Sequence, residues 1–296
     1  MPGPVAVGLV GAGPWAQMVH APMLAAGPET RLAGVWARRP EAAADLAAKH
    51  GVPSFDRYEQ LLDNCEAVAF CVAPDAQVDL AIAAARAGKP LLLEKPLAGS
   101  LADAERLATA VAGAGVPSML MLSYRYAPHV RRFIDEARGF EASGARGGFV
   151  GGGFLPGSPF AFGWRLERGA LLDLGPHVFD LAEAVLGPIA RLRASGDPLR
   201  FAAVLAEHES GAVSTLSFSG SVAVDPPRVG LELFGPRGTM ALDALAADWP
   251  EVFATIRSEF AAMVRTRQPH ELDAARGLHL QQLVAEAGRD HPTLPG

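Results

Sequence analysis

The sequence predicts an α/β protein of two domains: a doubly wound parallel sheet in residues 1–123, then an α+β domain with a mainly antiparallel sheet in residues 124–296. In the first part, strands that are apolar along their whole length alternate with amphipathic helices, which is typical of a parallel sheet covered on both faces. After Tyr124, strand-like runs follow one another with turn residues between them, which indicates hairpins. A chain of 296 residues is long enough for two ordinary domains.

The first domain alternates strands and helices in chain order. Strands are predicted at Val5–Val10, Arg31–Val35, Ala67–Val72, Pro90–Leu93 and Ser118–Leu122, and helices at Ala16–Ala26, Glu41–His50, Val78–Ala87 and Leu101–Ala114. Gly88 and Gly115 directly follow two of the helices, as expected of helix-ending glycines. The run His20-Ala21-Pro22 is expected to end the first helix rather than to bind a ligand, because proline disrupts a helix interior.

The second domain has a different pattern. A helix is predicted at Pro128–Arg138, a Gly-rich region without assigned structure covers Gly139–Gly163, and the strongest helical pattern covers Gly169–Leu186. Hairpin strands and two closing helices are expected at Ile189–Ala194, Phe201–Glu207, Val213–Ser219, Val229–Phe234, Thr239–Leu242, Glu251–Thr266 and Leu272–Ala287. The tail from Pro292 is expected to be frayed.

Composition argues against several classes of protein. The net charge is −6, and no cluster of Lys and Arg is interleaved with aromatic residues, so a nucleic-acid surface is not expected. The chain has no apolar run of membrane-spanning length and no charged leader before a cleavable apolar stretch. Cys65 and Cys71 lack nearby histidine ligands in the sequence, so neither a metal site nor a disulfide is predicted, and the reducing cytoplasm is the expected compartment.

A glycine loop follows the first strand. Gly11-Ala12-Gly13-Pro14-Trp15-Ala16 fits the G-x-G-x-x-G/A pattern of dinucleotide-binding Rossmann domains, and it lies between a strand and a helix as that pattern requires. Gly11 permits the tight turn, Gly13 lets the backbone approach a pyrophosphate, and Ala16 allows close packing of helix on strand. A tight turn without a ligand is the alternative interpretation.

The end of the second strand indicates which dinucleotide is preferred. NAD-specific sites usually have an acidic residue here for the ribose 2′-hydroxyl, but this chain has Ala37, Arg38 and Arg39. An arginine suits a 2′-phosphate, so NADP is favoured over NAD. Solvated turn arginines are the alternative.

Lys95 is the outstanding candidate for chemistry. The chain has 26 basic side chains, of which only Lys49, Lys89 and Lys95 are lysines. Arginine keeps its proton in proteins, whereas a buried lysine can titrate. Because Lys95 follows the apolar run Leu91–Leu93 within Glu94-Lys95-Pro96, it is placed for catalysis, although a solvated lysine is the alternative.

These motifs together resemble the glucose-fructose oxidoreductase/inositol dehydrogenase/rhizopine-catabolism (Gfo/Idh/MocA) family. The glycine loop, Glu94-Lys95-Pro96 and the segment Gly169-Ala170-Leu171-Leu172-Asp173-Leu174-Gly175-Pro176-His177 occur in the family's order. Arg125-Tyr126-Ala127-Pro128 resembles the segment that opens the family's second domain, and Trp164-Arg165 resembles a pair that precedes its acid–histidine helix.

The resemblance implies an NAD(P)-dependent oxidoreductase that interconverts an alcohol and a ketone of a sugar, cyclitol or related polyol. It assigns Lys95, Asp173 and His177 as catalytic residues, of which His177 would move the proton, Lys95 would act electrostatically and Asp173 would anchor substrate. It adds substrate contacts from Arg125, Trp164 and Arg165, although each arginine is as readily a structural ion-pair partner. It also implies a homodimer or homotetramer, and a peptide before Pro96 that can be cis.

The chain departs from the family pattern after the third buried strand. Ala73, Pro74 and Asp75 are predicted cofactor contacts together with Glu94, Lys95 and Pro96, but Asp75 stands where many members have Asn, and the His expected about three residues later is absent. The nicotinamide contacts of this loop are therefore in doubt. The alternative function is a non-catalytic dinucleotide sensor or regulatory protein on the same fold, but the presence of Lys95, Asp173 and His177 favours an enzyme.

Overall fold

The computed structural model describes residues 3–289, so the predicted frayed tail from Pro292 lies outside the described residues. Contacts divide the described chain into two compact units. Unit 1 comprises residues 3–121 and 253–278, and unit 2 comprises residues 122–252 and 279–289. None of the helices in the described part of the chain has the length and apolarity that crossing a bilayer requires.

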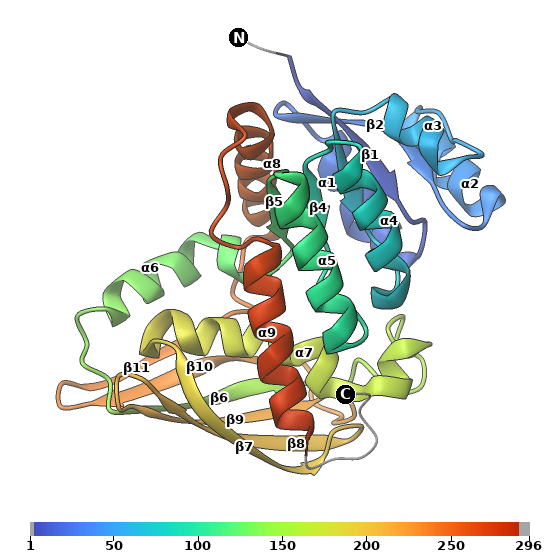
Figure 1. The fold of residues 1–296 in the computed structure, drawn as a ribbon. Coiled ribbons are helices and arrows are strands. Elements are labelled where there is room, and N and C mark those ends of the chain that lie inside the picture. Colours follow the sequence, from blue (N-terminus) through green and yellow to red (C-terminus); the bar gives the residue numbers. More distant parts are fainter. Residues whose placement is uncertain (1–2, 290–296) are drawn as a thin grey trace. The chain divides into compact units, whose positions relative to one another are not determined.

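Unit 1 contains a parallel sheet of five strands in the order β2-β1-β3-β4-β5, of which Figure 1 labels β1, β2, β4 and β5. The strands are β1 (Val5–Val10), β2 (Thr30–Trp36), β3 (Ala67–Phe70), β4 (Leu91–Leu93) and β5 (Ser118–Leu120). All six residues of β1 are buried, as expected of a strand covered on both faces. The doubly wound fold predicted from the apolar strands is confirmed.

The helices of unit 1 lie largely where the sequence predicts them. They are α1 (Ala21–Ala25), α2 (Pro40–His50), α3 (Tyr58–Asp63), α4 (Pro74–Arg86) and α5 (Leu101–Ala114). The bounds of α5 are those predicted, because Ser100 caps its first turn and Gly115 ends it in the left-handed conformation. The six-residue helix α3 was not predicted.

The prediction that His20-Ala21-Pro22 ends the first helix is wrong. A π-helical turn, η1 (Ala16–His20), runs directly into α1, and Pro22 lies in the first turn of α1. Proline has a φ that suits a helix, and at this junction of two hydrogen-bond patterns it continues the helix instead of ending it. His20 is fully buried at the junction of the two segments.

The residues that follow β1, β3 and β4 lie at one edge of the sheet in unit 1. In a parallel sheet, all strands point the same way, so the residues that follow β1, β3 and β4 lie at the same edge. The order reverses beside β1, and such a switch point is where doubly wound sheets bind ligands. Gly11, Cys71 and Glu94 each follow one of these strands directly or within one residue.

Unit 1 also includes a late segment of the chain. Residues 124–296 were all assigned to the second domain from the sequence, whereas residues 253–278 pack in unit 1. The Arg257 guanidinium lies 3.1 Å from the carboxylate of Glu29, and the backbone nitrogen of Ala274 donates to the Ser118 hydroxyl at 3.0 Å. These bonds attach parts of α8 (Trp249–Thr266) and α9 (Ala274–Gly288) to unit 1.

Unit 2 is built on a six-stranded sheet in the order β11-β10-β6-β9-β8-β7. The strands are β6 (Gly144–Val150), β7 (Ile189–Asp197), β8 (Phe201–His208), β9 (Val213–Ser219), β10 (Arg228–Gly235) and β11 (Gly238–Asp243). Only the β6–β9 pair is parallel among these neighbours, so the mainly antiparallel prediction is confirmed. The strand β6 was missed because its glycines obscure a strand pattern.

One face of this sheet is covered and the other is open. The buried side chains of β8 alternate with exposed ones, and the helix α7 (Trp164–Leu186) packs on the covered face (Figure 1). A second helix of this unit is α6 (Pro128–Ala137), preceded by the 3₁₀ turn η2 (Ser123–Tyr126). The open face carries the apolar side chains of Phe201, Leu205 and Val213, each more than 40% exposed.

Candidate functional site

The glycine loop is tightly packed at Gly11 and open at Gly13. Gly11 has φ of 117°, and a side chain there would collide with the backbone carbonyl of Cys71. A side chain on Gly13 would instead point into open space, so its backbone can be approached closely by a ligand. The predicted loop residues Pro14, Trp15 and Ala16 continue into η1. The loop therefore fits the predicted cofactor contact.

The end of β2 presents two guanidinium groups beside this loop. The backbone nitrogen of Gly11 donates to the carbonyl of Trp36 at 2.8 Å, so the loop and the strand end are adjacent. Ala37 follows, and Arg38 and Arg39 are exposed. Within residues 3–289, neither arginine side chain has a hydrogen-bond or ion-pair partner, so both are available to an anionic ligand.

The turn that carries Lys95 is held by a side chain that the sequence did not indicate. Gln77 is fully buried in α4, and its amide nitrogen donates to the carbonyls of Glu94 at 3.0 Å and Leu97 at 2.9 Å. Its amide oxygen accepts from the backbone nitrogen of Glu94 at 2.8 Å. Gln77 thus fixes both sides of the turn around Lys95 and Pro96, whose connecting peptide is cis, as the family resemblance implied.

Glu94 joins this turn to the glycine loop. Its carboxylate accepts from Trp15 Nε1 at 3.1 Å and from the backbone nitrogen of Lys95 at 3.1 Å. The same carboxylate lies 2.6 Å from His20 Nε2. Of the predicted cofactor residues, Trp15, Glu94 and Lys95 are therefore connected by hydrogen bonds. The residues Ala73, Pro74 and Asp75 begin α4, where Asp75 is exposed.

His20 connects Glu94 to Cys71. Burial alone would lower the pKa of His20, but the charge of Cys71 and hydrogen bonding with Cys71 and Glu94 outweigh burial and raise the pKa to about 10. One side-chain nitrogen of His20, the sulfur of Cys71 and one carboxylate oxygen of Glu94 all lie within 4.8 Å of one another. No histidine is close to Cys71 in the sequence, but the fold brings His20 beside it from 51 positions away.

The helix α7 places Asp173 and His177 four residues apart in unit 2. Pro176 lies inside this helix without breaking it, and the only non-helical residue within α7 is Gly169, with φ of 79° and ψ of −174°. A side chain on Gly169 would collide with the carbonyl of Pro198, so the kink has a packing reason. Asp173 and His177 are both buried, at 4% and 7% exposure.

The two arginines predicted to contact substrate form ion pairs with carboxylates of α7. Arg165 Nε lies 3.1 Å from the Asp173 carboxylate, and its guanidinium stacks 4.6 Å from the ring of Trp164. Arg125 Nη1 lies 2.9 Å from the carboxylate of Asp180, which is fully buried. Of the two interpretations left open for these arginines, these contacts favour ion pairing, which compensates carboxylates removed from water.

Tyr124 is a further neighbour of this pair that the sequence did not indicate. Its ring meets the His177 ring edge-on, with 5.0 Å between centroids. Burial, followed by the charges of Asp173 and Asp243, raises the pKa of Tyr124 well above its usual range, so its hydroxyl keeps its proton. Tyr124 lies near the predicted domain boundary, where no motif marks it.

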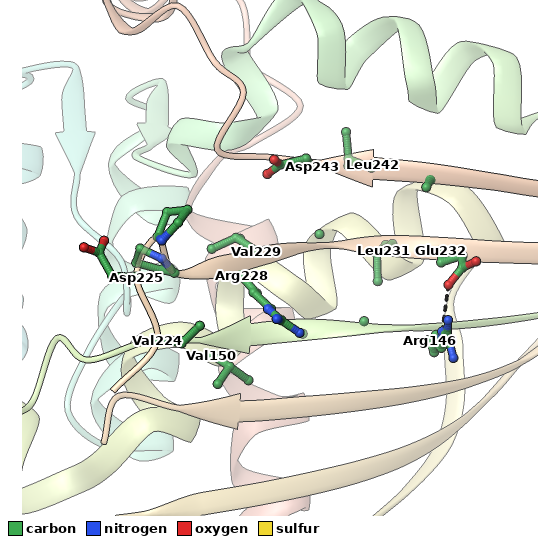
Figure 2. Close-up of a pocket in the computed structure, with 16 residues that line it drawn as sticks. Arg146, Val150, Val224, Asp225, Arg228, Val229, Leu231, Glu232, Leu242 and Asp243 are labelled. Carbon is green, nitrogen blue, oxygen red and sulfur yellow. Dashed lines mark hydrogen bonds and ion pairs between the residues drawn. The ribbon is translucent and has the colours of Figure 1, made fainter. Parts of the chain in front are cut away.

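A separate depression lies on the open face of the six-stranded sheet. It has a volume of about 520 Å³ and is lined by β6, β10, β11 and the segment before β10, as Figure 2 shows. Arg146 and Glu232 form an ion pair of 2.7 Å across it. None of the residues predicted for cofactor, substrate or catalysis lines this depression.

Two family models match the chain. Residues 5–122 match the model described as an oxidoreductase family with an NAD-binding Rossmann fold. Residues 145–241 match the C-terminal domain model of the same GFO/IDH/MocA family. The two models together cover more than half of the chain, and they divide it near the boundary predicted from the sequence.

Two curated relatives are a sugar dehydrogenase and a cyclitol dehydrogenase. A D-apiose dehydrogenase of Paraburkholderia graminis is 31% identical over 54% of this chain and 46% of its own length. An inositol 2-dehydrogenase of Rhizobium meliloti is 31% identical over 62% of this chain and 55% of its own length. The chain thus matches only about half the length of these relatives.

A solved structure shares the whole fold. The structure of a levoglucosan dehydrogenase in complex with NADH and levoglucosan has a TM-score of 0.84 and 19% identity, covering 97% of this chain and 98% of the other. At this identity the likeness shows the fold alone.

Proposed function

The chain belongs to the GFO/IDH/MocA oxidoreductase family, and on that basis we propose that it transfers a hydride between a nicotinamide dinucleotide and an alcohol or ketone carbon of a sugar, cyclitol or related polyol. The observation that carries this proposal is the presence of the buried Asp173–His177 pair on α7 together with Lys95 in a hydrogen-bonded turn at the carboxyl end of β4. A protein that only binds dinucleotide would not need all three residues.

The proposed chemistry divides between cofactor and protein. A bound nicotinamide supplies or accepts the hydride, and the chain must move the hydroxyl proton and orient the substrate. His177 is proposed as the group that takes or gives this proton, because imidazole titrates near neutral pH. The Lys95 ammonium is proposed to polarise the substrate oxygen.

Asp173 is proposed as a substrate anchor. A carboxylate accepts hydrogen bonds from the hydroxyl groups of a polyol. Arg165 Nε donates to one oxygen of this carboxylate, which compensates its removal from water in a nearly buried position. The Tyr124 hydroxyl is a protonated donor in the same neighbourhood, and we add it to the proposed site.

NADP is the proposed preferred cofactor, with NAD as the alternative. The support is the exposed Arg38 at the end of β2, next to the glycine loop and without a carboxylate partner in the described chain. A guanidinium pairs well with a 2′-phosphate but gains little from a 2′-hydroxyl. Fluorescence titration of NADPH and NADH against wild type and Arg38→Ser tests this preference. We expect Arg38→Ser to weaken the affinity for NADPH about tenfold, as for loss of one charged hydrogen bond, and to leave the affinity for NADH unchanged. A wild-type protein that binds NADH more tightly than NADPH would contradict the proposed preference.

The partner proposed in addition to substrate is a second copy of the chain. The open sheet face exposes Phe201, Leu205 and Val213, and it also carries the depression with the Arg146–Glu232 ion pair. Apolar side chains gathered on one face are typical of an interface. A homodimer or homotetramer built through this face is therefore proposed. The reducing cytoplasm is the proposed compartment, because neither cysteine forms a disulfide in the part of the chain that the structure describes.

A turnover screen tests the enzymatic proposal. Sugars, inositols and cyclic diols are offered with both cofactors, and absorbance at 340 nm is followed. On any substrate found, His177→Ala and Lys95→Met should each lose about 10²–10⁴-fold in kcat, the usual scale for losing an acid–base group. Lys49→Met is the matched control, since Lys49 is exposed and bonds only to Gln17 among the contacts described.

The outcomes separate the two functions considered from the sequence. Wild-type turnover in both His177→Ala and Lys95→Met would refute the proposed site. Tight dinucleotide binding with no turnover on any polyol would favour the non-catalytic sensor instead.

A further inference from the structure

Cys71, His20 and Glu94 form a thiol–imidazole–carboxylate cluster at the carboxyl edge of the parallel sheet. Their donor atoms lie within 4.8 Å of one another, and the Glu94 carboxylate is 2.6 Å from His20 Nε2. His20 is fully buried, and its other ring nitrogen, Nδ1, has no hydrogen-bond partner. The proposed hydride transfer uses neither this imidazole nor the thiol.

The three groups match the arrangement that activates a cysteine. A carboxylate on one imidazole nitrogen orients the ring and stabilises its charged form. A thiol beside an imidazolium held in this way is converted to the thiolate, which is the nucleophilic form. Glu94, His20 and Cys71 supply these three groups.

We propose that Cys71 is a modification site, a reactive thiolate held by His20 and Glu94 that hydrogen peroxide oxidises to a sulfenic acid. The Cys71 sulfur attacks one peroxide oxygen, a sulfur–oxygen bond forms and the oxygen–oxygen bond breaks. The imidazolium of His20 gives its proton to the departing hydroxide, which leaves as water. Sulfur is oxidised by two electrons and the peroxide is reduced, so no further reactant is needed.

The chain provides an internal comparison in Cys65. The two cysteines are almost equally buried, at 9% exposure for Cys71 and 7% for Cys65, so access alone does not separate them. Burial is the main cause that raises the pKa of Cys65, and its thiol faces the carbonyl of Leu62 at 3.7 Å. Cys65 is therefore expected to stay a neutral, slowly reacting thiol.

Differential labelling tests the proposal. The protein is treated with substoichiometric peroxide and dimedone in the presence of EDTA, so that no metal occupies the donor atoms, and each cysteine peptide is quantified by mass spectrometry. An unperturbed thiol is only a few per cent thiolate at pH 7, so Cys71 should be labelled at least about tenfold faster than Cys65. Equal labelling of the two cysteines, or faster labelling of Cys65, would overturn the proposal.

Variants and denaturant separate activation from exposure. Glu94→Gln and His20→Gln should each slow Cys71 labelling several-fold and leave Cys65 unchanged, with circular dichroism confirming the fold. Glu94→Gln is nearly isosteric, so it serves if His20→Gln does not fold. In denaturant the ratio of the Cys71 to the Cys65 labelling rate should fall to about one. A Cys71 labelling rate in Glu94→Gln as high as in wild type would refute the assigned role of the cluster. The oxidation needs neither dinucleotide nor polyol, so labelling tests it independently of the proposed dehydrogenase activity.

Discussion

Replacing Gln77 with methionine should destabilise unit 1 although it hardly changes the core volume. The substitution removes three hydrogen bonds, two donated by the amide nitrogen and one accepted by the amide oxygen. The backbone groups of Glu94 and Leu97 that lose their partner are wholly or partly buried. At about 1 kcal/mol for each hydrogen bond, the loss is about 3 kcal/mol, which is a large fraction of the stability of an ordinary domain.

Chemical unfolding measures this loss. Urea titration followed by circular dichroism should show a lower midpoint, and the melting temperature should fall by about 6–12 °C on the usual scale for a chain of this size. Gln60→Ala is the matched control, because the Gln60 amide makes one exposed bond, to the backbone nitrogen of Arg57 at 3.1 Å, and should cost about 1 kcal/mol or less. A Gln77→Met protein within 1 kcal/mol of wild type would refute the reasoning.

Three further outcomes are expected. Gly169→Ala should lower the free energy of unfolding by about 1–3 kcal/mol, because φ is 79° and a side chain would meet the Pro198 carbonyl. Gly153→Ala, whose side chain would enter open space, should leave the melting temperature unchanged. Leu205→Glu should lower the molar mass in light scattering, and an unchanged mass would contradict self-association through the open sheet face. The pKa of His20 is raised in the fold, so its contribution to stability is complete below pH 6.5 and is lost as pH rises through about 10. The difference in melting temperature between wild type and His20→Asn should therefore narrow over that range, and a widening difference would contradict the assignment.

The fold was predictable because it depends on local patterns. Runs such as β1 are apolar throughout, and α5 is bounded by a capping serine and a glycine that any reader of the sequence can see. The strand β6 was not predictable, because Gly147 and Gly148 give no strand signal on their own. A side chain on either would collide with a neighbouring strand, and that requirement exists only once the sheet is assembled.

The candidate site was predictable where it follows a contiguous motif and not where it depends on pairing. The glycine loop and the turn around Lys95 are motifs, so their residues could be named in advance. The contact of His20 with Glu94 joins residues 74 positions apart, and the hydrogen bonds of Gln77 reach across 17 and 20 positions. Such contacts follow from strand order, which no local pattern specifies.

The return of residues 253–278 to unit 1 has a consequence for the order in which the protein can be made. A ribosome synthesises the chain from its N-terminus, and domains generally fold as units during synthesis. Unit 1 can complete its fold only after residues 253–278 have been synthesised, because this segment carries Arg257, the partner of Glu29. By then nearly the whole of the six-stranded sheet domain has left the ribosome. A gene fragment that stops after β5 would lack that segment, so an isolated dinucleotide-binding half is better obtained by joining the two stretches than by truncation.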